Sequence, residues 1–90
     1  MQKPTLHTGG TSKRALEEGY VNVGHAVRAA IKALEDAEPN GRDYYPQGES
    51  AIYEAQREHA DRIERVRAVL AEVEAIVRHC RKADDERRGR

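Results

Sequence analysis

The chain has 90 residues, of which 38% are hydrophobic and 36% charged, and it contains no tryptophan or phenylalanine. Its 16 basic and 16 acidic residues balance to zero net charge and are mixed along the sequence. Such mixing argues against nonspecific nucleic-acid binding through a broad basic face. One cysteine excludes an intrachain disulfide. No apolar run approaches the roughly 20 residues of a membrane span, and we expect a cytoplasmic protein.

The N-terminal part predicts an arm followed by a helix. Residues 1–11 are polar and contain a proline and a glycine pair, which favours a flexible arm. Ser12 is a candidate helix cap, and residues 12–84 are expected to form one helical domain. The first helix is predicted over about 13–38. Its apolar residues alternate four and three apart, the period of one helix face, and are Leu16, Tyr20, Val23, Val27, Ala30, Leu34 and Ala37. Flanking positions Gly19, Ala26 and Ala33 are all small.

The connector, residues 39–49, is long for a helix–helix connection and carries two tyrosines, with a third just beyond it. Tyrosine, arginine and the free N–H groups of a helix start can hold an anion. The candidate ligand or partner site is therefore Arg42, Asp43, Tyr44, Tyr45, Gln47, Tyr53, Gln56 and His59. A structural interpretation stays open for the same residues. The tyrosines would then cap the end of the helix pair, and the two polar seam residues Gln56 and His59 would fix its register.

A second helix is predicted over about 50–84, followed by a charged tail, residues 85–90. Its apolar stripe repeats without a break in a heptad-like, coiled-coil pattern, and comprises Ile52, Gln56, His59, Ile63, Val66, Leu70, Val73, Val77 and Cys80. Opposite charges four residues apart, such as Asp61–Arg65 and Glu74–Arg78, support the helix.

These elements predict an all-α fold, an antiparallel two-helix hairpin with a long tyrosine-containing connector. With Glu38 folded beside Ser50, the end of the second helix would extend past the start of the first. The exposed overhang would need a cover, either the N-terminal arm with Leu6 or a second subunit. We expect a homodimer that forms a four-helix bundle. The candidate interface is Val66, Val69, Leu70, Val73, Ile76, Val77 and Cys80.

No constellation of residues indicates catalysis or metal binding. His79 and Cys80 are adjacent and face different sides of a helix, and Gln56, not glutamate, lies three residues before His59. Cys80 lies on the apolar stripe, where cysteine acts as a small hydrophobe. The sequence therefore predicts a protein that is not an enzyme, with no metal and no cofactor.

The connector motif, residues 39–48, reads PNGRDYYPQG and is followed by a charged helix. It resembles small helical proteins of phages and prophages, and the resemblance covers roughly residues 20–80. This resemblance implies an accessory role in a phage context, including action against host defences. Helical hairpins that oligomerise and hold cyclic nucleotides are one class of such proteins.

Three functions are compatible with the sequence. The leading hypothesis is a non-enzymatic, oligomeric interaction protein that binds a host protein through its connector and outer faces. The alternative is a binder of a small nucleotide-like anion, acting as a sponge. A third is weak association with nucleic acid through the C-terminal arginines.

Overall fold

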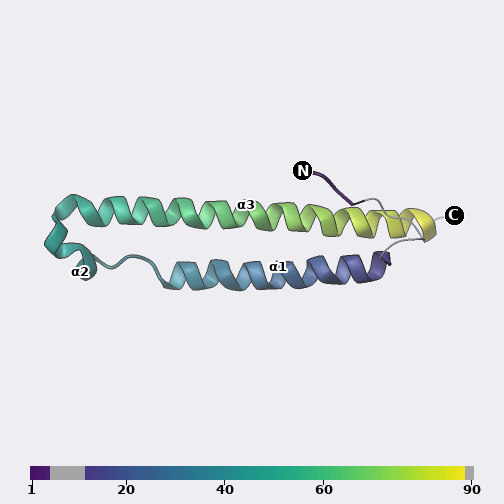
Figure 1. Ribbon diagram of the computed structural model, residues 1–90, viewed down its shortest axis with the longest axis horizontal. Helices are drawn as coiled ribbons and strands as arrows, with labels where there is room; N and C mark the ends of the chain where they lie inside the picture. Colours follow the sequence, from purple (N-terminus) through teal and green to yellow (C-terminus); the bar gives the residue numbers. More distant parts are fainter. Residues whose placement is uncertain (5–11, 89–90) are drawn as a thin grey trace.

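The computed structural model describes residues 1–4 and 12–88, so Leu6 lies outside the described residues. The described chain contains α1 (Lys13–Asp36), α2 (Gly41–Tyr44), the 3₁₀ turn η1 (Tyr45–Gln47) and α3 (Glu49–Arg88). The all-α prediction is confirmed. Figure 1 shows α1 and α3 side by side along the long axis, with α2 at one end. The molecule measures 65 × 21 × 19 Å, so two helices account for most of its shape.

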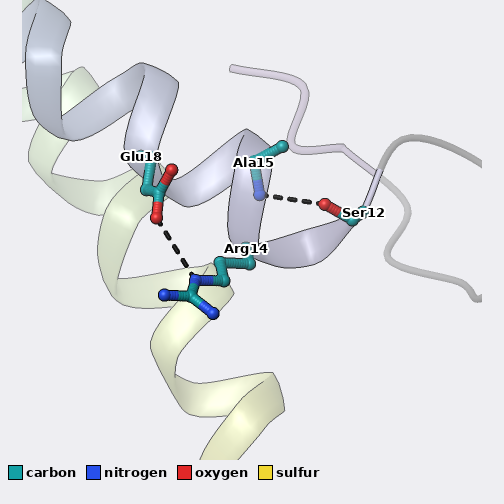
Figure 2. Close-up of polar contacts among 4 residues, drawn as sticks. All are labelled: Ser12, Arg14, Ala15 and Glu18. Carbon is teal, nitrogen blue, oxygen red and sulfur yellow. Dashed lines mark hydrogen bonds and ion pairs between the residues drawn. The ribbon is translucent and has the colours of Figure 1, made fainter.

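The start of α1 follows from its capping residue. The Ser12 hydroxyl accepts a hydrogen bond from the Ala15 N–H at 3.1 Å (Figure 2), which satisfies one of the free donors in the first turn. Nε of Arg14 lies 3.3 Å from Oε1 of Glu18, one turn further on, and forms an ion pair with it. The helix ends at Asp36, two residues before the predicted end, and Ala37 forms its C-terminal cap.

The connector is more ordered than the loop that the sequence predicts. The Asn40 side chain accepts from the Arg42 N–H at 2.9 Å, which starts the single turn of α2. Pro46 then lies in the first turn of η1, where its fixed φ suits a helix start. Gly48 follows at φ 104°, a left-handed conformation that favours glycine. These short turns fill the space between the end of α1 and the start of α3.

α3 is a single helix of 40 residues that continues to Arg88, beyond the predicted end at residue 84. The predicted Asp61–Arg65 pair forms at 3.1 Å. The predicted Glu74–Arg78 pair is wrong, because Glu74 instead pairs with Arg28 across the seam at 2.9 Å. Within the described residues, no helix combines the length and hydropathy that crossing a membrane requires.

The core is small and lies along the seam between α1 and α3. Its buried apolar residues are Ile31 of α1 and Val73, Ile76, Val77 and Cys80 of α3. The predicted stripe of α3 is confirmed in part, because three of these residues belong to it, whereas its member Gln56 is exposed. The predicted stripe of α1 is rotated, since Val23 is 42% exposed while Gly24 and Ile31 are buried. α1 carries two apolar rows side by side, one that contains Ala30 and one that contains Ile31. The row with the larger residue, Ile31, faces α3.

Three ion pairs, named here the cross-helix ion pairs, fix how α1 and α3 are aligned. They join Glu17 to Arg81 at 3.7 Å, Arg28 to Glu74 at 2.9 Å and Glu35 to Arg67 at 3.6 Å. From one pair to the next, the residue number on α1 rises while that of its partner on α3 falls, so the helices are antiparallel. Successive residues rotate by 100°, which puts all three pairs on one side of the seam.

This alignment overturns the predicted overhang at the end of α3. Arg81 lies beside Glu17, so Ile76, Val77 and Cys80 pack within the length of α1 and are buried in one chain. The prediction assumed a tight turn that would place Glu38 beside Ser50. The connector instead spans residues 37–48 with its own helical turns, which shifts the register by 10 to 14 residues. The first turns of α3 therefore extend beyond α1, and α2 and η1 contact them.

The first residues of the chain lie against the far end of α3. The ring Nε2 of His79 lies 3.1 Å from the Pro4 carbonyl oxygen, within hydrogen-bond distance. A hollow beside this contact is lined by Lys3, Ala75 and Lys82 among others. These contacts involve residues 3 and 4 of the arm and the side of α3 that carries His79, and not Ile76, Val77 or Cys80, which the arm or a second subunit was expected to cover.

Candidate functional site

His59 is the one polar residue in the described core, with an exposed fraction of 6%. Its Nε2 donates to the Leu34 carbonyl, and its Nδ1 accepts from Arg62 at 3.1 Å. These two roles are those of the neutral Nε2–H tautomer. The Leu34 carbonyl also accepts from the Ala37 N–H at 3.2 Å, so His59 adds a second donor and ties the end of α1 to α3.

The connector tyrosines differ in their exposure. Tyr44 is half-buried, whereas Tyr45 is 85% and Tyr53 is 71% exposed. Tyr44 and Tyr45 line a hollow of about 550 Å³ together with Ile52 at the start of α3. This hollow has the aromatic walls that the sequence predicts for a ligand or partner site.

The other predicted site residues are dispersed around the connector end. Gln56 and His59 line a second hollow of about 250 Å³, whose wall also includes Glu35 and Glu38. Two carboxylates disfavour an anion in this hollow. Of the remaining candidates, Arg42, Asp43 and Gln47 are exposed residues of the connector. The structure thus puts Tyr44 and Tyr45 in one hollow and Gln56 and His59 in another, and the other four predicted residues line neither.

The predicted interface residues are divided in the same way. Val73, Ile76, Val77 and Cys80 are buried inside one chain. Their burial removes the reason for which a second subunit was expected to cover them. Val66 and Leu70 are half-buried, and Val69 is 46% exposed.

An exposed apolar surface does exist, and it lies mainly on α1. Small residues spaced alternately four and three apart form a row, named here the exposed α1 row, in which every member is exposed: Gly19, Val23, Ala26, Ala30, Ala33 and Ala37. By the 100° rotation per residue, the row lies on the side of α1 opposite the cross-helix ion pairs. The Glu35–Arg67 pair also places Val69 of α3 level with Ala33, near the C-terminal end of the row. Three members of this row were part of the predicted α1 stripe and three were its small flanking residues.

A groove lies on the ion-pair side of the seam and has a volume of about 440 Å³. We name it the arginine groove, because Arg28 of α1 and Arg78 and Arg81 of α3 line it. Gly24 forms part of its wall, where the absence of a side chain leaves space beside Val73. Sequence reasoning missed this groove, because Arg28 meets the α3 arginines only in the observed register.

The chemistry of Cys80 matches a structural role. Burial raises the pKa of its thiol, the Glu17 carboxylate raises it further, and Lys13 opposes the shift. A protonated, buried thiol is a poor nucleophile. In the part of the chain that the structure describes, no group of three or more His, Cys, Asp or Glu side chains gathers where it could hold a metal ion.

Comparison of the sequence with protein-family models gives no match. Comparisons with curated proteins and with solved structures also give no significant match. The functional proposals below therefore depend on the geometry of this chain.

Proposed function

We propose that this protein is a non-catalytic interaction module that acts as a self-associated helix pair, with the exposed α1 row as the contact between two copies. The observation that carries the proposal is the row itself, six exposed small residues in a heptad-like spacing. This spacing is the one with which two helices keep a continuous seam. Two α1 helices in contact, each already packed on its α3, would form the four-helix bundle.

The side chains of the row suit a helix–helix contact. Axes of packed helices lie about 8–10 Å apart depending on the residues between them, and small residues allow the short end of this range. Gly19, Ala26, Ala30 and Ala33 carry at most one methyl group, and Val23 adds a larger knob. A row without charged or polar members has no side chain to desolvate, so contact between two copies carries no electrostatic cost there.

The exposed area of one chain supports the same proposal. The chain exposes 7037 Å², whereas a compact monomer of its mass would expose roughly 5,300 Å². The excess, on the order of 1,700 Å², is larger than the roughly 800 Å² that each partner contributes to a standard interface. The five apolar residues that are buried among those described also form a small core for a chain of this length. Association would therefore supply burial that a single chain lacks.

Self-association leaves the connector free for a further partner. Tyr45 and Tyr53 lie in and just beyond the connector, at the end of the molecule far from the termini, and are well exposed. Aromatic residues and arginine are enriched in protein interfaces. A two-copy assembly would present two such tyrosine surfaces to a host protein.

A pair of matched variants tests the proposal. Ala30→Glu places a carboxylate in the middle of the exposed α1 row, whereas Ala71→Glu makes the same change on the outer surface of α3. Both positions are exposed in one chain, so the helix content measured by circular dichroism should remain equal. Sedimentation equilibrium over a range of concentrations then gives the mass of each variant.

We expect the unchanged protein and Ala71→Glu to approach twice the chain mass of 10.1 kDa. Ala30→Glu should raise the dissociation constant of the pair by about tenfold or more, because each copy would bury an unpaired charge. Equal masses for the two variants would overturn the proposed contact. A mass of one chain for the unchanged protein at all concentrations would overturn self-association.

A further inference from the structure

The arginine groove has a composition that none of the functions above uses. Three guanidinium groups line it, and the lining includes one carboxylate, that of Glu74. The chain as a whole has no net charge, so this excess of positive charge is local. The α1 wall adds the ring of Tyr20 and the imidazole of His25.

The charged groups of the groove are available to a ligand. Arg78 forms no ion pair or hydrogen bond with the described residues, because its expected partner Glu74 is bonded to Arg28. The Arg28–Glu74 pair is itself half-exposed, with side-chain exposures of 53% and 42%. Exposed pairs of this kind contribute about 0–1 kcal/mol. An anion can therefore bind Arg28 at little cost and also meet Arg78, which has no ion pair among the described residues.

We propose that the arginine groove binds the phosphate group of a small molecule. Guanidinium groups match the oxygen geometry of phosphate and bind it with paired, charge-assisted hydrogen bonds. Arg81 is paired with Glu17 and Arg28 with Glu74, so the three arginines leave an excess of one positive charge, which suits an anionic phosphate group. The Tyr20 ring and the open space at Gly24 would take the uncharged part of the ligand.

The boundaries of the groove favour a small ligand over an extended chain. The cross-helix pair Glu17–Arg81 lies toward one end of the groove, and Arg28–Glu74 lies toward the other. The volume of about 440 Å³ lies within the range of about 300–1,000 Å³ for small-molecule sites. A longer polymer would have to cross both ion pairs.

A titration with pyrophosphate tests this site. The 15N-labelled full chain is titrated at constant ionic strength, and the amide chemical shifts are followed by NMR. Acetate at the same ionic strength is the comparison anion. Arg78→Gln removes a groove arginine, and Arg57→Gln removes an exposed arginine of α3 that does not line the groove.

Pyrophosphate should shift the amides of Gly24, His25 and the facing residues 73–78, and acetate should not. Arg78→Gln should weaken the binding about tenfold, since a hydrogen bond between charged groups is worth about one such factor, while Arg57→Gln should bind like the unchanged protein. Shifts of the same pattern with both anions, or equal effects of the two substitutions, would overturn the site. Because the groove and the exposed α1 row lie on opposite sides of α1, the mass of Arg78→Gln should equal that of the unchanged protein, which separates this result from the test of self-association.

Discussion

Gly24→Ala should stabilise the protein, although Gly24 is buried in the seam. A Cβ atom at this position would lie 3.8 Å from Cγ1 of Val73 and 3.9 Å from a guanidinium nitrogen of Arg28, which are ordinary van der Waals distances. Alanine is favoured over glycine by about 1 kcal/mol inside a helix. The new methyl group would bury further apolar area, for which about 0.8 kcal/mol per group is an upper value. The expected gain is therefore about 1–1.5 kcal/mol.

Gly19→Ala is the matched comparison, because a Cβ atom there meets nothing within 4 Å. It should gain the helix preference alone, about 0.5–1 kcal/mol. Since Gly19 belongs to the exposed α1 row, both variants are made in the Ala30→Glu background and compared at low concentration, which keeps the contribution of self-association small. Thermal unfolding followed by circular dichroism should show a rise of several degrees for each variant, at about 4–8 °C per kcal/mol. A loss of stability in Gly24→Ala would show that α1 and α3 approach more closely than described here.

Two further substitutions test the seam. His59→Ala should lower the free energy of unfolding by about 2 kcal/mol, because it removes a buried side chain and its hydrogen bond to the Leu34 carbonyl. Urea unfolding measures this loss, with His25→Ala at an exposed position as the control. A loss no larger than that of His25→Ala would refute the role of His59 at the end of α1. The raised pKa of the Cys80 thiol predicts that stability is lost above about pH 8.5, where the unfolded thiol releases its proton and the folded one retains it. Urea unfolding at pH 7 and pH 10 should therefore show a smaller decrease for Cys80→Ala, and equal decreases would contradict the burial of this thiol.

The seam of α3 was predictable because its heptad pattern is unambiguous. His59, Val73, Val77 and Cys80 are all in the predicted stripe and all buried. A long, regular row of apolar residues on a helix with charged remaining positions leaves one face to bury.

The seam of α1 was not predictable in the same way. Alanine and glycine contribute little to a hydrophobic pattern, so the row that contains Ala30 and the row that contains Ile31 compete. The structure buries Ile31 and leaves Ala30 exposed, which is the arrangement that removes more apolar area from water. The choice between the rows depends on the partner helix, and hence on the register.

The connector determines the register of α1 against α3. The register in turn determines where the candidate sites lie. Asn40, Pro46 and Gly48 are recognisable turn residues, but a sequence does not show that their turns add length rather than reverse the chain at once. The shift of 10 to 14 residues brings Arg28 beside Glu74 and Arg81 beside Glu17. Charge patterns across the two helices are consistent with this alignment, yet they become specific only after the turn is known.

The most direct measurement of the proposed self-association is an isotope-filtered NMR experiment on an equal mixture of 13C-labelled and unlabelled chains. This experiment detects contacts between copies without any substitution. We predict contacts between copies at the methyl groups of Val23, Ala26 and Ala30, and none at Ala71. Contacts between copies at Ala71 but not at Ala30, or none at all at millimolar concentration, would contradict the exposed α1 row as the surface through which this protein acts.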